Sequence, residues 1–352
     1  MIATETKIQM YKGAPWCLGR YDSFAINKPQ LITFLGHDYV IWKDELGNLN
    51  ALDNICPHAG ANLAKGGYIV DFEDKSCLAC PYHGNKVQFL GDGKAIIEGN
   101  ISSQTIQSVL PLQVIDGLVW SYGLDWQERD GKLVSEPIKP KLSVPDYSNI
   151  FVLPQLDSPL RINELTNIYS QSESVNCGIS QAIWNIHDSE HFAGTHRDTI
   201  LTEEVKIDNL TQNENKLFWE LITYKRKDRD AKRNKLNFLV DDVMVQYFNT
   251  FLPSLILVSV KIKGQLILGV ITMHPESTQK NRICFDSYVN PDFTWWQKLL
   301  KLPKIANNFR DRVFFEDISI LNNLYPTFNK KIALKNDTPA ELAMNYLKNW
   351  DS

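Results

Sequence analysis

The sequence predicts an α+β protein with two domains: an all-β domain, then a domain in which an antiparallel sheet surrounds a long helix. Three observations lead to this fold class. The chain has 352 residues, which is too long for one typical core. Short alternating apolar segments occupy its first third, and longer strand-like segments followed by a helical tract occupy the rest. We expect the two domains to comprise residues 1–135 and 136–352.

The all-β prediction rests on the segment from Leu31 to about Gly123. Apolar residues alternate with polar ones in stretches such as "YVIWKDELGNLNALD" and "LPLQVIDGLVWSYG", and glycine, asparagine and aspartate interrupt them. This pattern is typical of short strands joined in hairpins. Prolines then recur at close intervals between Arg129 and Pro159, which predicts a linker there.

The second domain is predicted from four further strand-like segments, "LFWELITY", "LILVSVKI", "LILGVITM" and "ICFDSYV". A helical tract from about Phe293 to Leu324 follows them, and strands followed by a long helix favour an α+β domain. A last helix is expected to start at Thr338, whose hydroxyl would cap it. Pro339 would then occupy the first helical position, and Glu341 would complete a capping box.

Composition and charge exclude several classes of function. The formal net charge is −4 and the isoelectric point is near 6.0, which gives no broad electrostatic reason to bind nucleic acid or anionic membranes. The most apolar region, Phe251 to Met273, is interrupted by a proline, lysines and a glycine, short of the roughly 20 apolar residues that a membrane helix needs. The N-terminus lacks the features of a secretory signal, so we expect a cytoplasmic protein with no membrane or nucleic-acid partner.

The segment from Cys56 to Gly84, "CPHAGANLAKGGYIVDFEDKSCLACPYHG", predicts a metal site. Its pattern is Cys-x-His, then 21 residues, then Cys-x-x-His, so each of two loops offers one thiolate and one imidazole. A structural zinc finger usually takes two like ligands from each of its two elements. The mixed pattern instead suits a two-iron cluster in which cysteines hold one iron and histidines hold the other.

This segment closely resembles the fingerprint of the Rieske [2Fe-2S] centre. The resemblance implies that Cys56 and Cys80 bind one iron and that His58 and His83 bind the other. Cys77 lies outside the pattern and is expected to be a buried free thiol. The spacing between the two loops is somewhat long for an oxygenase, and an asparagine follows the histidine-glycine pair where many relatives have tryptophan; neither departure affects a ligand.

A second histidine-rich segment, "WNIHDSEHFAGTH", can be interpreted in two ways. The letters "HDSEH" match the inverted zinc-peptidase pattern H-x-x-E-H, in which His187 and His191 would bind zinc and Glu190 would act as the general base. Five residues are a weak signal. The Rieske-like segment upstream decides against this alternative, because a peptidase has no use for a one-electron carrier.

The other interpretation uses the longer pattern Asn185-x-x-Asp188-x-x-His191-x-x-x-x-His196. This pattern resembles the mononuclear iron site of the Rieske non-haem iron oxygenases, and it implies that His191 and His196 bind an iron(II). Such a site needs two histidines and one carboxylate on one face of the metal, with the other positions open.

The helical tract "FRDRVFFEDISILNNL" offers three candidates for that carboxylate: Asp311, Glu316 and Asp317. The residues three and four positions from Asp317 are all apolar, whereas Glu316 neighbours an arginine and a serine, and Asp311 neighbours two asparagines. A carboxylate in an apolar face is costly unless it is paired or binds a metal. We therefore expect Asp317 to be the third ligand, and the family's late Glu-Asp pair indicates the same residue.

The resemblance also assigns roles to two residues that do not bind the metal. It implies that Asp188 hydrogen-bonds His191 and, across a subunit boundary, His83 of the adjacent subunit. This link would give electrons a path between the centres and implies a head-to-tail ring, a homotrimer. Asn185, one turn before Asp188, is expected near the iron without binding it tightly.

The resemblance covers nearly the entire chain, and the oxygenase α subunits of this family combine a Rieske domain with a catalytic domain of the helix-grip type. It implies the terminal oxygenase component of a Rieske system, which uses O₂ to hydroxylate or oxidatively demethylate a small organic substrate. No Gly-rich dinucleotide fingerprint is present, so a separate NAD(P)H-dependent reductase, with or without a ferredoxin, would supply electrons. The alternative from another class is a Rieske electron carrier fused to a ligand-binding domain.

Overall fold

The computed structural model describes residues 11–145, 162–228, 241–262, 265–289, 302–325, 332 and 334–350. The chain forms two compact units, Met1–Val144 with Glu276–Thr278, and Pro145–Pro275 with Gln279–Ser352. The main segment of the first unit therefore ends at residue 144, later than the boundary expected between residues 135 and 136. The N-terminal unit keeps a β-hairpin that ends at Pro137, so the first part of the predicted linker is a strand. The rest of that linker, from residue 146, lies outside the described residues.

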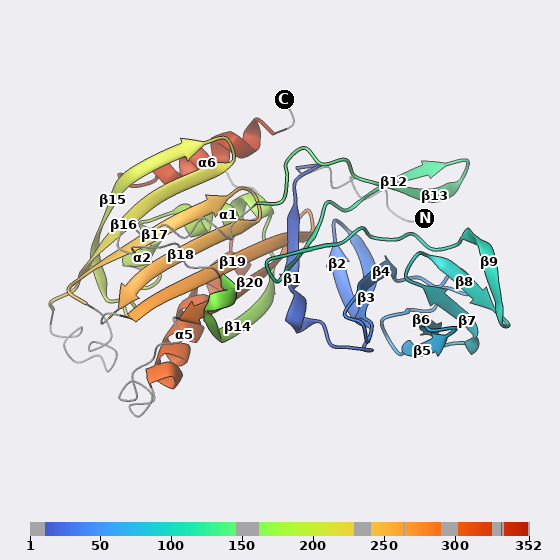
Figure 1. Cartoon of the computed structure of the whole chain (residues 1–352). Helices are drawn as coiled ribbons and strands as arrows, with labels where there is room; N and C mark the ends of the chain where they lie inside the picture. Colours follow the sequence, from blue (N-terminus) through green and yellow to red (C-terminus); the bar gives the residue numbers. More distant parts are fainter. Residues whose placement is uncertain are drawn as a thin grey trace. The chain divides into compact units, whose positions relative to one another are not determined.

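The described part of the N-terminal unit consists of short antiparallel strands in four small sheets, in keeping with its alternating sequence (Figure 1). Their orders are β1-β11-β10, β2-β3-β4, β5-β6-β7-β8-β9 and β12-β13. The strands are β1 Trp16–Arg20, β2 Gln30–Phe34, β3 His37–Lys43, β4 Leu49–Asp53, β5 Tyr68–Phe72, β6 Lys75–Cys80, β7 Gly84–Leu90, β8 Lys94–Ile97, β9 Asn100–Thr105, β10 Gln113–Ile115, β11 Leu118–Ser121, β12 Leu124–Arg129 and β13 Lys132–Pro137.

One cluster of the N-terminal core joins β3 and β4 to the five-stranded sheet. Trp42 and Leu52 pack in this cluster with Phe89, and all three side chains are fully buried. Cys56 and Cys80 belong to the same cluster, so the two cysteines of the Rieske-like motif are anchored in a rigid apolar core. Their loops are thereby fixed relative to each other.

The C-terminal unit contains a seven-stranded antiparallel sheet with the order β14-β20-β19-β18-β17-β16-β15. Its strands are β14 Thr166–Val175, β15 Thr202–Asn213, β16 Lys216–Lys225, β17 Val243–Phe251, β18 Leu255–Ile262, β19 Gln265–Ser277 and β20 Lys280–Val289. All four segments that the sequence predicted as strands lie in this sheet, as β16, β18, β19 and β20.

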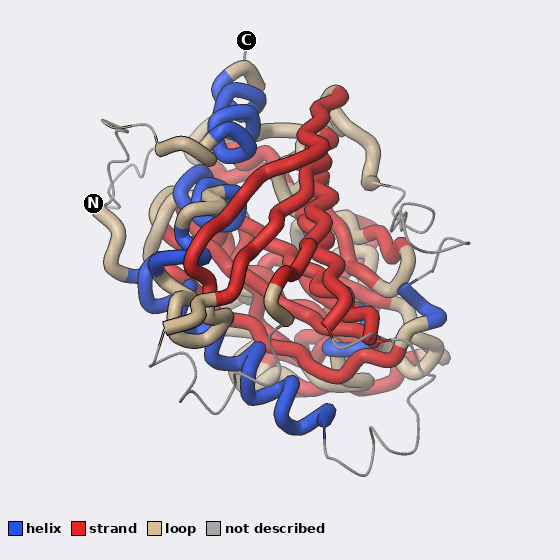
Figure 2. Tube along the Cα trace, turned by 90° about the vertical axis from the view of Figure 1, so that its left-hand side faces the viewer, coloured by secondary structure: helices blue, strands red, loops and turns tan. Residues whose placement is uncertain are grey.

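The described helices of this unit are α1 Ile179–His187, α2 His191–Gly194, α5 Leu302–Asn322 and α6 Thr338–Lys348. The long helix α5 contacts β14 and α1, and α1 packs against α6. Figure 2 shows the helices as blue coils beside the red strands, with the last helix leading to the C-terminus. The expectation of a sheet combined with a long helix is confirmed, and the first part of the predicted helical tract, before residue 302, lies outside the described residues.

The start of α6 corrects one detail of the sequence analysis. Thr338 is the first helical residue, and Asp337 precedes it as the N-cap, without a side-chain capping bond. The Asp337 carboxylate instead accepts a hydrogen bond from the main-chain N–H of Leu334, at 2.8 Å. The expected capping box of Thr338 and Glu341 is therefore wrong, although proline does stand at the start of the helix.

A membrane-spanning helix is not found: within the described ranges, no helix combines the length and the apolar character that crossing a bilayer requires.

Candidate metal centres

The four residues of the Rieske-like motif lie in two loops of the N-terminal unit. Cys56 and His58 follow β4, while Cys80 ends β6 and His83 stands just before β7. Both cysteines are at most 1% exposed, whereas His58 is exposed and His83 is half-buried. The Nδ1 atoms of the two histidines are 3.2 Å apart. The structure thus separates a buried thiol pair from an outward imidazole pair, as a cluster with two differently held irons requires.

The local backbone explains how these loops hold their shape. The N–H of Gly60 donates to the carbonyl of Cys56 at 2.8 Å, and the N–H of Cys56 donates to Ala61 O at 2.9 Å, which closes a tight turn. At Gly67 a Cβ atom would lie 2.2 Å from Leu63 O, so only glycine fits there. The turn is therefore set by main-chain bonds and by a close approach that a side chain would prevent.

The surroundings of Cys56 and Cys77 shift the pKa values of their thiols. Burial raises the pKa of Cys56, and the neighbouring Cys80 thiol raises it further. Cys77 is a fully buried free thiol, as the sequence predicted, and burial raises its pKa to about 11. Cys77 is therefore an unreactive packing residue at neutral pH.

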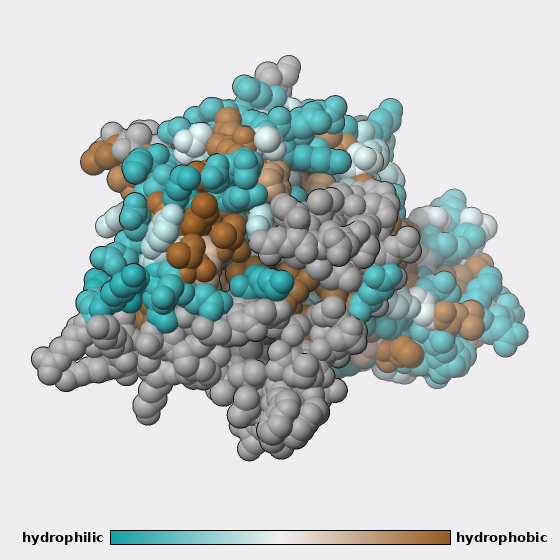
Figure 3. Space-filling model, turned by 60° about the vertical axis from the view of Figure 1, so that its left-hand side comes forward, coloured by the Kyte–Doolittle hydropathy of each residue, from teal (hydrophilic) through white to brown (hydrophobic). Residues whose placement is uncertain are grey.

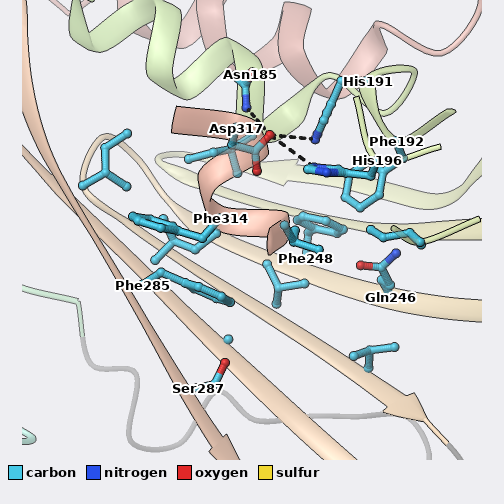
Figure 4. A pocket seen from close by; sticks show the side chains of 18 of the residues that line it. Asn185, His191, Phe192, His196, Gln246, Phe248, Phe285, Ser287, Phe314 and Asp317 are labelled. Carbon is cyan, nitrogen blue, oxygen red and sulfur yellow. Dashed lines mark hydrogen bonds and ion pairs between the residues drawn. The ribbon is translucent and has the colours of Figure 1, made fainter. Parts of the chain in front are cut away.

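In the C-terminal unit, two histidines and one aspartate meet at one point (Figure 4). His191 comes from α2, His196 from the turn after it, and Asp317 from α5. The Oδ1 atom of Asp317 lies 3.2 Å from Nε2 of His196 and 3.6 Å from Nε2 of His191. One potential ligand atom from each residue lies within 4.8 Å of the others. The structure thus brings together the three residues expected from the sequence as metal ligands.

The far side of each imidazole is held by a second group, which fixes the tautomer. Nδ1 of His191 is hydrogen-bonded to the main-chain oxygen of Asp188. Nδ1 of His196 lies 2.9 Å from Oε2 of Glu316, whose other oxygen accepts a bond from the Thr199 hydroxyl. With both Nδ1 atoms engaged in this way, both Nε2 atoms are directed toward Asp317. Metal-binding histidines are commonly oriented in this way.

The charges at this point favour a cation. Burial acts to lower the pKa of His196, but the carboxylates of Asp317 and Glu316 outweigh burial and raise it to about 9. Burial lowers the pKa of His191, and Asp317 offsets this only in part. Burial acts to raise the pKa of Asp317, yet its two histidine neighbours keep that pKa below its usual value. A half-buried carboxylate flanked by two imidazole nitrogens fits a divalent metal, whose ligand set would be the facial triad of iron(II).

Asn185 and Asp188 take different places around the triad. The Nδ2 amide of Asn185 donates to Oδ1 of Asp317 at 3.3 Å, so Asn185 touches the triad without belonging to it. The carboxylate of Asp188 accepts a bond from the N–H of Glu190 at 3.0 Å, and its link to the first metal histidine runs through the main chain. Burial raises the pKa of Asp188, and the nearby Asp337 adds to the shift.

The arrangement that a zinc peptidase would need is not formed by the described residues. His187 is fully buried and bonded at both nitrogens, to Ile183 O at 2.7 Å and to the Thr250 hydroxyl at 2.8 Å. Burial lowers its pKa to about 4. Glu190 accepts a bond from the side-chain amide of Asn336 at 2.6 Å. His187 is a neutral packing residue, and "HDSEH" is not a metal-binding unit.

Sequence reasoning missed the role of Glu316. Its helical neighbours Arg312 and Ser319 indicated a solvent-facing position, but its carboxylate turns toward a histidine 120 residues away. The adjacency of a glutamate to the metal aspartate was the one available signal. Asp311, the other candidate, is exposed and accepts a bond from the Tyr169 hydroxyl at 2.9 Å.

An apolar cavity of about 210 Å³ adjoins the triad and lies between the sheet and the helices. Alternate residues of β17 to β20 point into it, which is why the apolar face of "LILVSVKI" carries Val258 and Val260. From α5, Phe314 and Leu321 line it beside Asp317. On the face that Figure 3 shows, hydrophilic residues prevail among the described ones, and a hydrophobic patch lies near the centre.

Comparison with known proteins supports both the Rieske-like motif of the N-terminal unit and the fold of the chain. Residues 15–104 match the family described as "Rieske [2Fe-2S] domain". Over 97% of both chains, the structure superposes on dicamba monooxygenase bound to dicamba, with a TM-score of 0.69 and 15% sequence identity. The chain contains a Rieske [2Fe-2S] domain and has the fold of the Rieske oxygenases. A second structure, NdmA of Pseudomonas putida CBB5 with caffeine, matches with a TM-score of 0.65 and 15% identity, over 97% of this chain and 92% of that one.

Curated relatives of this Rieske oxygenase-like chain match over shorter stretches. Cholesterol 7-desaturase nvd 2 of Ciona intestinalis is 28% identical over 247 residues, which are 67% of this chain and 48% of that protein. The oxygenase component of a probable 3-ketosteroid-9-alpha-monooxygenase of Rhodococcus rhodochrous is 38% identical over 78 residues, 22% of this chain and 18% of that protein. The chain spans less than half the length of the curated relatives it matches here.

Proposed function

We propose that this chain is the terminal oxygenase component of a Rieske non-haem iron system and oxidises a small organic molecule with O₂. The observation that carries the proposal is the meeting of His191, His196 and Asp317, in which both Nε2 atoms lie beside one carboxylate. The same chain also contains a Rieske domain. Such a triad holds a metal by one face and leaves the others open. The relatives named above include a monooxygenase component and a desaturase, which supports oxidation at carbon.

The residues present fit both groups. Cys56, Cys80, His58 and His83 would hold the cluster, and the triad would hold an iron(II) ion. When bound, the cluster supplies single electrons and the ferrous ion supplies O₂ activation.

The remaining residues of the site orient the ligands and keep the centre dry. Glu316 fixes the ring of His196 through its Nδ1 atom, and Asn185 fixes the carboxylate of Asp317. Phe192 is 7% exposed and packs edge-on against His196, with ring centroids 5.5 Å apart, which keeps water from one side of the imidazole. These contacts hold the triad in the geometry that metal binding needs.

The proposal includes the route of the electrons. A separate reductase, with or without a ferredoxin, would reduce the cluster. The electrons would then leave the cluster through His83 of the N-terminal unit. The chains would form a head-to-tail trimer in which Asp188 of one subunit meets His83 of the next. Sedimentation of the iron-loaded protein tests this part, with a trimer as the expected species and a monomer as the contradicting one.

Oxygen consumption coupled to product analysis tests the proposed activity. The iron-loaded chain, a reductase and reduced nicotinamide are mixed with each member of a panel of neutral ring compounds. We expect substrate-dependent O₂ uptake and a product with one added oxygen, one lost methyl group or one new double bond. O₂ uptake that no compound stimulates, with cluster and triad both loaded, would contradict the proposal.

A further inference from the structure

The cavity beside the triad has almost no polar surface. Its lining from the sheet and from α5 is aliphatic and aromatic, with Phe248, Phe285 and Phe314 as the largest side chains. The rings of Phe285 and Phe314 are stacked, with centroids 6.1 Å apart and planes inclined by 13°. Flat walls of this kind complement a ring-bearing ligand.

No lysine or arginine is among the described residues that line this cavity. Among these residues, the one charged group apart from the two histidines is Asp317, whose carboxylate already contacts both histidines. A charged ligand would lose its hydration against this lining without gaining an oppositely charged side chain as a partner, and burying an unpaired charge is costly. The lining therefore selects for an uncharged molecule.

Within the described part of the chain, two polar groups of the lining lack a hydrogen-bond partner: the Nε2 amide of Gln246 and the hydroxyl of Ser287. Gln246 is 8% exposed and lies between Met244 and Phe248 on the inward face of β17. Figure 4 shows its amide at the wall of the cavity, with the oxygen on the side of Phe248. Rotation about the last side-chain bond exchanges the oxygen and the nitrogen, so the amide can donate into the cavity. A buried amide without a partner is destabilising, so such a group is usually satisfied by a ligand or by water.

We propose that the cavity takes an uncharged, mainly apolar ring compound with one acceptor oxygen, a carbonyl or hydroxyl, to which Gln246 donates a hydrogen bond. This inference rests on the proposed function and names its substrate class. Gln246 projects from the sheet, whereas the triad is carried by α2, the turn after it and α5. The hydrogen bond therefore orients the molecule and fixes which of its carbons faces the metal. Gln246 is thus a specificity-determining residue.

The volume of the cavity bounds the size of the buried ring system. A dry apolar cavity of about 150 Å³ holds benzene. The cavity here, at about 210 Å³, accommodates one ring more. A bicyclic ketone and the matching hydrocarbon are therefore suitable probes, and 1-tetralone and tetralin differ only at the oxygen that the proposal concerns.

Binding of these two probes by calorimetry, anaerobically and without reductant, tests the inference on the full chain. We expect wild type to bind 1-tetralone about tenfold more tightly than tetralin, because only the ketone satisfies the amide. In Gln246→Leu this preference should vanish while tetralin binds at least as well as to wild type. Ser287→Ala, which removes the other unpartnered group, should keep the preference.

Four results of this measurement would overturn the inference. A wild type that binds neither probe contradicts the ligand class, and a wild type without a preference contradicts the hydrogen bond. A preference that survives in Gln246→Leu, or that disappears in Ser287→Ala, contradicts the assignment to Gln246. Because this measurement needs no turnover, binding as expected without any oxygenation would contradict the proposed function alone.

Discussion

Glu316 and His196 form a carboxylate-histidine pair, with Oε2 of Glu316 2.9 Å from Nδ1 of His196. The imidazole is 1% exposed, and its other nitrogen faces Asp317. The pair therefore sets the direction in which His196 presents its Nε2 atom. Carboxylates in this position also raise the basicity of the imidazole as a ligand.

Replacing Glu316 with alanine should weaken metal binding by about 10- to 100-fold, because the ring of His196 loses its partner. Anaerobic titration with ferrous ion measures this affinity. Glu316→Gln, which keeps an acceptor oxygen, should lose less. Equal affinities for wild type and Glu316→Ala would show that the pair does not orient the ligand.

The variant Asp188→Asn removes the negative charge of the carboxylate between α1 and α2 and keeps an oxygen that can accept a hydrogen bond. The asparagine oxygen can still accept the N–H of Glu190, which Asp188 accepts at 3.0 Å. We expect unchanged metal content and cluster spectrum, with slower single-turnover electron transfer between the centres, because the variant loses the charge that the proposed electron path uses. Asp188→Ala, which also removes the acceptor, controls for the structural bond. A wild-type rate in Asp188→Asn would remove Asp188 from the electron path.

His187 makes the stability of the C-terminal unit depend on pH. Burial lowers the pKa of its imidazole from 6.5 to about 4 in the folded chain. The unfolded chain therefore binds more protons between these values, so the contribution of His187 is present above pH 6.5 and is lost as the pH falls toward 4. Between about pH 7 and pH 4.5 the loss amounts to about 2 kcal/mol.

Urea unfolding followed by tryptophan fluorescence measures this effect, since Trp219 lies 6.4 Å from the His187 ring. The variant His187→Gln cannot titrate, and its free energy of unfolding should fall less over the same pH range. An equal fall in both proteins would mean that His187 is not the titrating group.

Gly269→Ala should reduce the cavity. A Cβ atom at this position would lie 2.8 Å from Cε2 of Phe285, and the stacked Phe314 ring restricts how far Phe285 can move. We expect weaker binding of 1-tetralone and a loss of about 1 kcal/mol in stability. Gly194→Ala is the control, because a Cβ atom there meets nothing within 4 Å. Similar affinities of both variants would show that Phe285 does not limit the ligand.

Much of the candidate site could be predicted because its chemistry is local in the sequence. The expected cluster ligands lie in two short loops, and the pairing of one cysteine with one histidine in each loop separates them from a zinc finger. The apolar helical neighbours of Asp317 set it apart from Asp311 and Glu316, and the structure places Phe314 and Leu321 beside it in the cavity. One of those neighbours, Ile320, is instead 43% exposed.

The parts that could not be predicted depend on contacts between distant segments. Glu316 meets His196 across 120 residues, and His187 meets Thr250 across 63 residues. The inward direction of Gln246 follows from its register in β17, which no local motif marks. At α6, Asp337 and Thr338 are both good caps, and only the backbone decides between them.

The central claim is that a Rieske cluster and a separate iron triad occur in one chain, and Asp317→Ala tests it through metal content. Iron and acid-labile sulfide are counted in anaerobically reconstituted wild type, in Asp317→Ala and in the control Asp311→Ala. The [2Fe-2S] cluster gives two irons and two sulfides, and the triad adds one iron. We predict three irons and two sulfides in wild type and in Asp311→Ala, and two of each in Asp317→Ala with an unchanged visible spectrum. Two irons and two sulfides in all three proteins would contradict the account and would indicate an electron carrier without a second metal.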